Sequence, residues 1–247
     1  MEPTCRADPA AAAAVHLWDL SGAILTQETW LGPDVLSRGE RERAAGLRPG
    51  EHRQRFVMAH ALMRVSVADA LGEGPACVRI DQTCPRCGRP HGKPRLVDHP
   101  DHDLSLAHAG ALVAVLLVRG RGGVDIERAG RVAATPSIVR VAFTAREQEA
   151  IAQHGHDPEL AVWFWTAKEA AAKAYGVHTP LLSTDFADTA LALQQPLRPR
   201  RWREGWSVTA FIPAAGYVGA AVTDVEAVSV RPVQSAARLL RGYCGAR

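Results

Sequence analysis

Residues 158–176 read PELAVWFWTAKEAAAKAYG, and this segment predicts a long helix over 158–175. Gly176 is expected to end it, because glycine readily adopts the left-handed conformation found at helix C-termini. Within the helix, Glu169 and Lys173 are four residues apart and share one face. Lys168 lies about 100° around the helix axis from Glu169. Taken alone, the Glu169–Lys173 spacing favours an ordinary surface ion pair over a catalytic role.

Residues 123–127, upstream of this helix, read Gly-Val-Asp-Ile-Glu and predict a short strand. Side chains two apart on a strand point to the same face, so Asp125 and Glu127 present two carboxylates together. Adjacent carboxylates repel each other unless a cation lies between them. Mg²⁺ is the cation that such a pair would be expected to bind, because it is a hard ion that prefers oxygen ligands. Taken alone, the pattern favours a strand with a solvated polar face.

The rest of the chain predicts a mixed α+β protein whose two halves have a similar order of elements. Strands are expected at 14–20, 77–81, 103–108, 111–118, 184–193, 206–211, 218–223 and 227–233. Helices are expected at 34–45, 51–71 and 145–153. A capping box, in which Thr144 bonds an exposed amide and Glu147 reaches back, predicts where the helix at 145–153 begins. Residues 82–94, rich in Pro, Gly and Cys, are expected to form a loop.

The composition is that of a globular protein with a core, with 47% hydrophobic and 22% charged residues among 247. A net charge of +3 is too small to argue for nucleic-acid binding, but it would suit an acidic partner or a phosphorylated ligand. Five cysteines without a secretion signal favour a reducing compartment. The longest strongly apolar run, 111–118, is too short to span a bilayer. We therefore expect a cytoplasmic monomer that binds neither nucleic acid nor membrane.

Two groups of basic residues could contact phosphate. Lys93, in the turn Gly92-Lys93-Pro94, and His108, at a strand end, are suitable donors, although a strand-end histidine more often makes only a local hydrogen bond. Six arginines lie on and between the first two predicted helices, where a solvated helical face is the default interpretation. These arginines are Arg41, Arg43, Arg48, Arg53, Arg55 and Arg64.

The loop at 82–94 contains Cys84-Pro85-Arg86-Cys87 followed by His91, which is the beginning of a zinc-knuckle pattern. A structural zinc ion needs four ligands, and the pattern supplies three. His99, His102 and Cys77 are the residues that could reach the fourth position. Because no fourth ligand is evident, the sequence favours a metal-free hairpin loop.

The motifs at 123–127 and 165–176 together resemble a family signature. Gly-x-Asp-x-Glu followed about forty residues later by Trp-x-x-Lys-Glu-x-x-x-Lys-x-x-Gly is similar to the signature of the phosphopantetheinyl transferases. The resemblance is to the larger, surfactin-synthetase-activator (Sfp) type, in which two similar α/β halves share one chain. It extends over roughly residues 38–211, and the chain's three lysines all fall on lysine positions of the family. Supporting pieces are Gly92-Lys93-Pro94, His108-x-Gly110, Phe143-Thr144-x-x-Glu147 and the Arg55–Arg64 spacing.

The resemblance implies a fold and a role for particular residues. It implies two halves related by a pseudo-twofold axis, each an antiparallel-type sheet packed with a long helix. Residues 1–120 would contact the nucleotide of coenzyme A, and residues 121–247 would carry the metal and the catalytic carboxylates. The implied metal ligands for Mg²⁺ are Asp125, Glu127 and Glu169, and the implied catalytic residues are Glu169 and Lys173. The implied coenzyme A contacts are Arg43, Arg55, Gly92, Lys93, Pro94, Ala107, His108 and Lys173.

The implied activity is transfer of the 4′-phosphopantetheine arm of coenzyme A to a serine of an apo acyl or peptidyl carrier protein, with release of 3′,5′-adenosine diphosphate. Glu169, directly or through a metal-bound water, would take the serine proton. The chain has Ala107-His108-Ala109 where the family usually has Ser-His-Ser, so backbone amides would replace a hydroxyl contact to phosphate. Two other functions stay open: a zinc-knuckle module that binds nucleic acid or protein, and a Mg²⁺-dependent phosphohydrolase.

Overall fold

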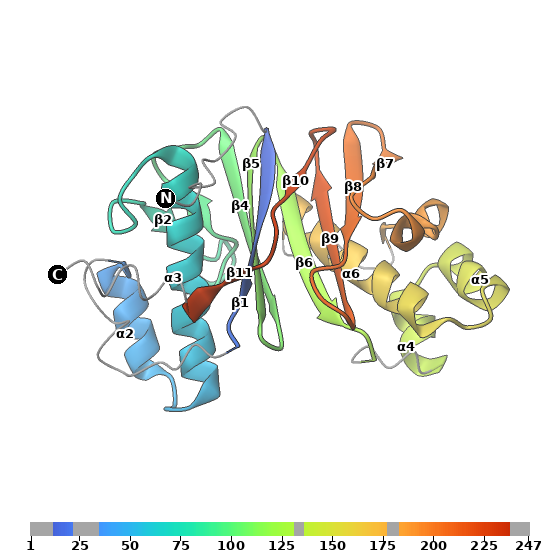
Figure 1. Cartoon of the computed structure of the whole chain (residues 1–247), viewed down its shortest axis with the longest axis horizontal. Coiled ribbons are helices and arrows are strands. Elements are labelled where there is room, and N and C mark those ends of the chain that lie inside the picture. Colours follow the sequence, from blue (N-terminus) through green and yellow to red (C-terminus); the bar gives the residue numbers. More distant parts are fainter. Residues whose placement is uncertain (1–11, 22–34, 131–135, 177–182, 238–247) are drawn as a thin grey trace, which may run out of the picture.

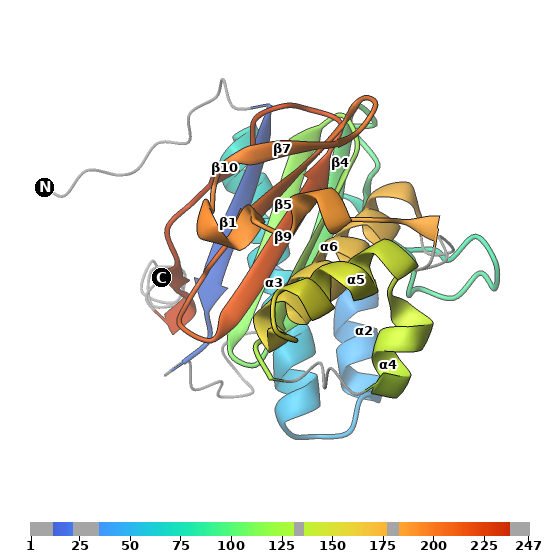
Figure 2. The same cartoon turned by 90° about the vertical axis from the view of Figure 1, so that its right-hand side faces the viewer.

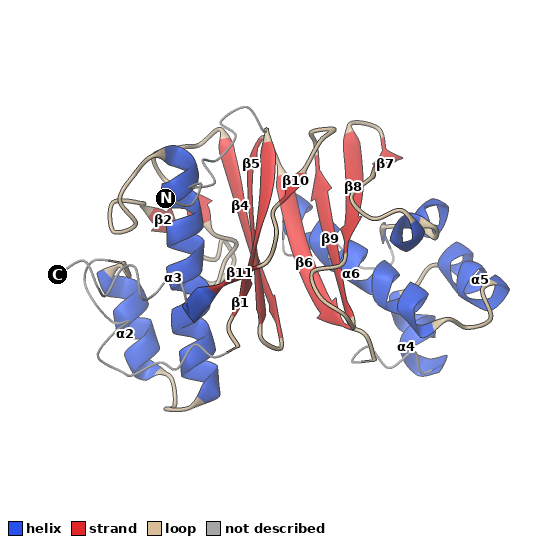
Figure 3. Ribbon diagram, viewed as in Figure 1, coloured by secondary structure: helices blue, strands red, loops and turns tan. Residues whose placement is uncertain are grey.

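The computed structural model of the chain describes residues 12–21, 35–130, 136–176 and 183–237. Two β-sheets lie next to each other in the middle of the molecule, and helices cover the outer side of each sheet (Figures 1 and 3). This arrangement confirms the predicted α+β class in its general form. Asp34, the predicted first residue of the first helix, lies outside the described residues.

The first sheet has the strand order β10-β1-β5-β4-β3-β2, with β11 also paired to β1. Its strands are β1 Ala13–Asp19, β2 Ile80–Asp81, β3 Arg95–Leu96, β4 His102–Ala109, β5 Leu112–Arg119, β10 Ser229–Val230 and β11 Gln234–Ser235. The pairs among β1, β5, β4, β3 and β2 are antiparallel, whereas β10 and β11 run parallel to β1. The C-terminal segment therefore returns to the sheet of the first half, across the boundary proposed at residue 120.

The second sheet is antiparallel and has the order β6-β9-β8-β7. Its strands are β6 Gly122–Arg128, β7 Pro199–Arg203, β8 Trp206–Phe211 and β9 Tyr217–Thr223. The helices are α2 Arg38–Gly46, α3 Glu51–Leu71, α4 Pro136–Ala142, α5 Ala145–Gln153 and α6 Pro158–Tyr175. Figure 2 looks onto the second sheet from the side of α5 and α6. None of the helices in the described residues is long and apolar enough to cross a membrane.

Three apolar clusters hold the layers together. The first lies between α3 and the first sheet, and it includes Leu62 and Val115. The second lies between α6 and the second sheet, and it includes Trp163 and Val222. The third lies between the two sheets, where side chains of β1, β4 and β5 meet those of β6, β8 and β9. The resulting order of layers is helix, sheet, sheet and helix.

A close approach between α6 and β6 sets the geometry of the second half. The face of α6 that meets β6 is built from small buried residues, among them Ala170 and Ala174. A Cβ atom on Gly123 would lie 2.1 Å from the carbonyl oxygen of Ala170 and 2.6 Å from the amide nitrogen of Ala174. Only glycine fits at this position, because any side chain would push the helix off the strand.

Most predicted elements are confirmed, and their ends follow from local signals. The helices at 51–71, 145–153 and 158–175 and the strand at 206–211 have the predicted bounds. The capping box is formed, since the Thr144 side chain accepts from the Glu147 amide and the Glu147 carboxylate accepts from the Thr144 amide. Gly72 ends α3 in the left-handed conformation, with φ of 70°.

Some predicted strands are wrong. Residues 184–193 form two short 3-10 turns, Ala187–Thr189 and Ala192–Gln194, because side chains take up their backbone groups. The Phe186 amide donates to Glu147, and the Asp185 carbonyl accepts from Trp202. The strands at 77–81 and 227–233 shrink to two-residue pairings at Ile80–Asp81 and Ser229–Val230. Sequence analysis missed β7 and α4, since neither has a clear apolar period.

Candidate active site

The two sheets meet at the open edge of β6, where side chains of β4 accept hydrogen bonds from the backbone amides of β6. The Gly122 amide donates to Asp103 Oδ2 at 3.0 Å, and the Val124 amide donates to Ser105 Oγ at 3.1 Å. Lys93 Nζ donates to the Gly122 carbonyl at 2.9 Å and also bonds Asp103. Buried backbone groups need such partners, so this polar seam joins the halves of the molecule.

Lys173 of α6 reaches the same seam. Its Nζ donates to the Asp125 carboxylate oxygen Oδ1 at 2.7 Å and to the Val124 carbonyl at 3.1 Å, with a longer contact of 3.4 Å to the Leu106 carbonyl. Lys173 thus bonds β6 and β4 at once. Its side chain is 28% exposed, so part of the residue faces solvent.

Asp125 is buried on β6, and only one of its two carboxylate oxygens has a partner among the described residues. Oδ1 accepts from Lys173, whereas Oδ2 is buried without a hydrogen bond. Burial raises the pKa of Asp125, although the nearby Lys173 ammonium opposes the shift. A buried, unpaired carboxylate oxygen is costly. The position therefore favours an additional positive charge or a proton.

Glu169, one turn before Lys173 on α6, belongs to the same electrostatic group. Its side chain is half-buried, and burial raises the pKa of Glu169. The negative charge of Asp125 raises this pKa further, and the Lys173 ammonium lowers it. The structure therefore brings together Asp125, Glu169 and Lys173, which the sequence places on two distant elements.

Glu127 lies on β6 two residues beyond Asp125 and is half-buried. The carboxylate oxygens of Asp125, Glu127 and Glu169 do not all lie within 4.8 Å of one another. The joint role of the three carboxylates as metal ligands stays a prediction. Asp125 instead turns one oxygen to Lys173.

Two predicted nucleotide contacts, His108 and Arg55, lie beside this group. His108 is exposed at the end of β4, and Arg55 lies on the first turns of α3 with its side chain 38% exposed. Loss of water lowers the pKa of His108, and the charges of Arg55 and Lys173 lower it further. The surroundings therefore favour the neutral form of the imidazole.

The other predicted contacts are more enclosed. Gly92, Pro94 and Ala107 are buried. A Cβ atom on Gly92 would lie 2.8 Å from the Thr83 carbonyl oxygen, so this glycine is required for the loop to close on itself. Arg43 donates to the Pro90 carbonyl and lies with its guanidinium 4.8 Å from the centre of the Phe56 ring. Arg43 thereby attaches the loop at 82–94 to the helices α2 and α3.

Two ion pairs in the core were missed by sequence analysis. Lys168 and Glu147 are fully buried, with Nζ 2.8 Å from Glu147 Oε2. Arg64, predicted among the solvated arginines, is also fully buried and bonds Glu40 Oε2 at 2.6 Å. Lys168 lies about 100° around the axis of α6 from Glu169. This offset was the one feature of the sequence that pointed to a structural role for Lys168.

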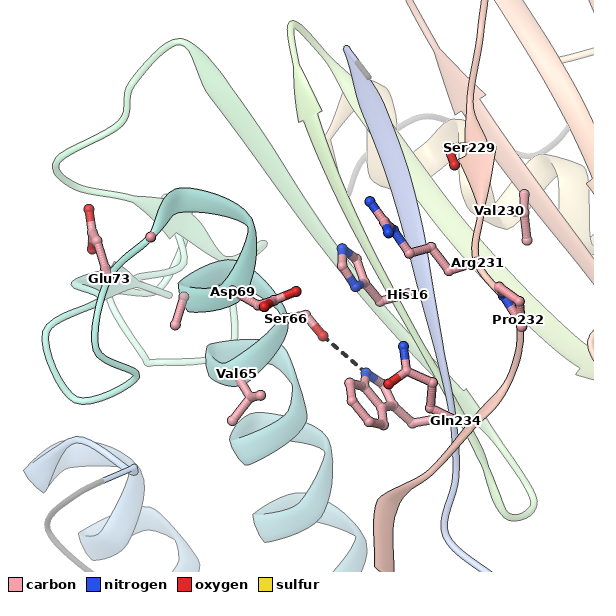
Figure 4. A pocket seen from close by; sticks show the side chains of 13 residues that line it. His16, Val65, Ser66, Asp69, Glu73, Ser229, Val230, Arg231, Pro232 and Gln234 are labelled. Atoms are coloured by element: carbon pink, nitrogen blue, oxygen red, sulfur yellow. Dashed lines mark hydrogen bonds between the residues drawn. The ribbon is translucent and has the colours of Figure 1, made fainter. Parts of the chain in front are cut away.

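A cavity of about 830 Å³ lies near the C-terminal end of α3, between this helix, β1 and residues 229–234 (Figure 4). Ser66 forms part of its wall and accepts a hydrogen bond from the Trp18 indole at 3.0 Å. Neither Asp125 nor Glu169 lines this cavity. His16 does, and its Nε2 is buried with no hydrogen-bond partner among the described residues.

His16 should make the folded state sensitive to acid. Burial lowers the pKa of His16 to about 4 from its ordinary 6.5, and the charge of Arg231 contributes to this shift. Between these two pKa values the unfolded chain binds the proton and the folded chain does not, so stability falls as the pH falls. We expect His16 to account for a loss of about 2 kcal/mol between pH 7 and pH 4.5.

The measurement is urea unfolding of the wild type and of His16→Gln at both pH values. His52→Gln, which changes an exposed histidine of α3, is the matched control and should keep the wild-type pH dependence. An equal pH dependence in the wild type and in His16→Gln would show that His16 is not the group that titrates.

Comparison with known proteins bears on the half of the chain that carries the carboxylates. The model of the 4′-phosphopantetheinyl transferase superfamily matches residues 121–210. The matched segment runs from β6 to β8 and contains Asp125, Glu127, Glu169 and Lys173. Over this segment the chain is similar to that superfamily, and the similarity suggests phosphopantetheine transfer. A search of the curated proteins finds no significant match.

Proposed function

We propose that the protein is a phosphopantetheinyl transferase of the surfactin-synthetase-activator type. It would transfer the 4′-phosphopantetheine arm of coenzyme A to a serine of an apo carrier protein and release 3′,5′-adenosine diphosphate. The observation that supports this most strongly is the group formed by Asp125, Glu169 and Lys173 within the segment that matches the superfamily. Perturbed carboxyl groups of this kind gather at functional sites.

The proposed substrate site lies between two halves of the chain. Residues 1–120 would supply the nucleotide contacts through Arg43, Arg55 and His108, and residues 121–247 would supply the catalytic carboxylates. A pseudo-twofold relation between the halves is part of the proposal. It is supported by the long helix on each sheet, α3 on the first and α6 on the second.

The residues present suit a bound Mg²⁺ ion. The unpaired oxygen of Asp125 and the raised pKa values of Asp125 and Glu169 indicate that the site lacks positive charge. Asp125 and Glu169 would hold the ion, with Glu127 as a third donor, since Mg²⁺ is often bound by one or two carboxylates together with substrate phosphates. When bound, Mg²⁺ would neutralise the diphosphate of coenzyme A.

The serine of the carrier protein supplies the nucleophile. Its oxygen forms a bond to the phosphorus next to the pantetheine, while the bond from that phosphorus to the bridging diphosphate oxygen breaks. The electron pair leaves with 3′,5′-adenosine diphosphate, and Glu169 accepts the serine proton, directly or through water. A raised pKa brings Glu169 closer to neutral pH, where a general base works best.

Lys173 contributes in two ways to this reaction. It holds one oxygen of Asp125 and so keeps that carboxylate oriented. Its partly exposed side chain would also let the ammonium stabilise the negative charge that gathers on the 5′-phosphate of the leaving 3′,5′-adenosine diphosphate. Lys93 differs, because its ammonium is enclosed by Asp103 and the Gly122 carbonyl. Its contact with coenzyme A would therefore require it to leave Asp103.

The proposed partners are the acidic carrier proteins of polyketide, nonribosomal peptide or fatty acid synthesis. Positive net charge on one partner and negative charge on the other speeds association and favours the right orientation. We further propose that the protein acts as a monomer in the cytoplasm.

Incubation with coenzyme A, Mg²⁺ and a panel of apo carrier proteins, followed by intact mass measurement, tests the function. We expect one carrier or more to gain the mass of phosphopantetheine, and a carrier whose serine is replaced by alanine to gain nothing. Hydrolysis of small phosphate esters without modification of any carrier would contradict the proposal and favour a phosphohydrolase.

Arg55→Ala should weaken coenzyme A binding more than it slows the chemical step. Arg55 lies beside His108, on the side proposed for the nucleotide, and contacts of this kind act equally in the ground and transition states. We expect KM for coenzyme A to rise by about 10-fold, with kcat within about 2-fold of the wild type. Initial rates measured over a range of coenzyme A concentrations give both values.

Arg48→Ala is the matched control, because Arg48 is exposed between the same two helices. It should leave both constants unchanged. A large drop in kcat for Arg55→Ala at saturating coenzyme A, with KM unaltered, would place Arg55 at the reacting phosphate instead.

A further inference from the structure

The loop at 82–94 contains a tight turn that presents the sulfur of Cys84 to backbone amides. The Gly88 amide donates to the Cys84 carbonyl at 2.9 Å, and Gly88 adopts a left-handed φ of 69°, which favours glycine. The amides of Arg86 and Cys87 donate to the Cys84 sulfur. The turn therefore holds this sulfur in a defined position at the start of the loop.

The loop then folds back and brings a histidine to the two sulfurs. The Cys84 amide donates to the Arg89 carbonyl at 2.8 Å, and the Gly92 amide donates to the Gln82 carbonyl at 2.7 Å. This closure places His91 Nε2 at 2.9 Å from Cys87 Sγ. One ligand atom from each of Cys84, Cys87 and His91 lies within 4.8 Å of the others.

These spacings suit a tetrahedral zinc ion. Zinc–sulfur bonds of about 2.3 Å and zinc–nitrogen bonds of about 2.0–2.1 Å place neighbouring ligand atoms about 3.5–3.8 Å apart. The Cys87–His91 separation of 2.9 Å is shorter than this range, and all three ligand atoms lie within 4.8 Å, so modest side-chain rotations would bring them to zinc-binding distances. Soft thiolates combined with an imidazole select zinc over magnesium or calcium.

We propose that Cys84, Cys87 and His91 bind one Zn²⁺ ion, with the fourth position open to solvent. The sequence favoured a metal-free loop because it offers three ligands where a closed structural site needs four, but three protein ligands with water in the fourth position also make a zinc site. Two of the suggested fourth ligands are engaged elsewhere, since His99 bonds Glu73 at 2.6 Å and His102 bonds Asp101 at 2.9 Å. Cys87 and His91 are exposed, so water can complete the tetrahedron.

The ion would bind the two ends of the loop together next to Gly92 and Lys93. The same loop receives the Arg43 contact at Pro90 and sends Lys93 into the seam between the sheets. Zinc would therefore order a segment that joins α2, α3 and β6. This inference stands on the loop alone and does not depend on the proposed transferase activity.

Metal content of the full chain tests the proposal. The protein is expressed in zinc-supplemented medium, purified with a phosphine reductant and without chelator, and analysed by plasma mass spectrometry. We expect about one zinc per chain in the wild type. Cys84→Ser and His91→Ala should each lower the zinc affinity by more than about 100-fold, since losing even an outer-shell partner costs 10- to 100-fold. Cys77→Ser, an exposed cysteine outside the group, should retain the ion.

Cobalt titration of the wild type keeps the test decisive even if a variant fails to fold. Co²⁺ bound by two thiolates gives an intense sulfur-to-metal charge-transfer band, and zinc should displace it. Amide hydrogen exchange of residues 84–92 should also slow when zinc is added. A wild-type protein in its reduced form that holds less than about 0.1 zinc per chain and gives no cobalt band would overturn the proposal.

Discussion

Replacing Glu169 by glutamine will lower the rate of phosphopantetheine transfer by about 10²- to 10⁴-fold, the usual contribution of a general base. Glutamine keeps the shape of the side chain but cannot accept the serine proton. The fold should be retained, because Glu169 is half-buried and belongs to neither of the core ion pairs. Transfer to an apo carrier at saturating coenzyme A and Mg²⁺, followed by intact mass, measures the effect.

The pH dependence of kcat/KM provides a second readout. A base must be deprotonated to act, so the wild-type rate should rise with pH through the raised pKa of Glu169. This rise of the rate with pH should disappear in Glu169→Gln. A variant that is merely misfolded would be slower at every pH but would keep the rise of kcat/KM with pH.

Asp125→Ala and Glu127→Gln separate metal binding from proton transfer. Asp125→Ala should also fail to modify the carrier at ordinary Mg²⁺, and excess Mg²⁺ or Mn²⁺ should restore part of its rate. Glu169→Gln should not be rescued in this way. Glu127→Gln should have the smallest effect of the three, because Glu127 does not join a compact ligand group in this structure. Wild-type rates in Asp125→Ala and Glu169→Gln would refute the proposed site.

Replacing Lys168 by methionine will lower the free energy of unfolding by about 3–5 kcal/mol, the usual cost of breaking a buried ion pair on one side. Lys168 Nζ bonds Glu147 Oε2 and the Thr184 carbonyl, and neither partner can turn to solvent from this position. Burial already raises the pKa of Glu147 against the opposing Lys168 charge, so removing that charge favours a protonated Glu147. Urea unfolding at pH 7 measures the loss.

The double variant Lys168→Met with Glu147→Gln should recover part of this stability, because it removes both charges together. Arg146→Ala is the matched control, since it breaks an exposed pair with Asp188 and should cost less than about 1 kcal/mol. A Lys168→Met protein within 1 kcal/mol of the wild type would show that the buried pair is not needed for stability.

Local signals in the sequence were enough to define several elements. The Thr144–Glu147 capping box begins α5, and glycines at 72 and 176 end α3 and α6. The alternation at 123–127 was sufficient to predict β6 and the positions of Asp125 and Glu127 along it. These features depend on hydrogen bonds and side-chain periods that span only a few residues, so they can be predicted from a short stretch of sequence.

Hydrogen-bond partners that are distant along the chain depend on the tertiary structure. The strand expected at 184–193 is absent because the Glu147 carboxylate and the Trp202 indole bond its backbone from other elements. Arg64 becomes a core residue because Glu40 and the carbonyls of Pro75 and Val78 surround its guanidinium. No local pattern distinguishes such an arginine from a solvated one.

The candidate site combines both kinds of information. The carboxylates and lysines that carry the resemblance to the transferase family can be read from the sequence, since a motif consists of residue types at fixed spacing. The folded chain was needed to show that Lys173 bonds Asp125, that Lys93 bonds Asp103, and that His91 contacts Cys87. The Lys173–Asp125 and Lys93–Asp103 contacts depend on how separate segments pack against each other, and the His91–Cys87 contact depends on how one loop folds back on itself. Packing is set by the shape and burial of the whole chain, which short stretches of sequence do not contain.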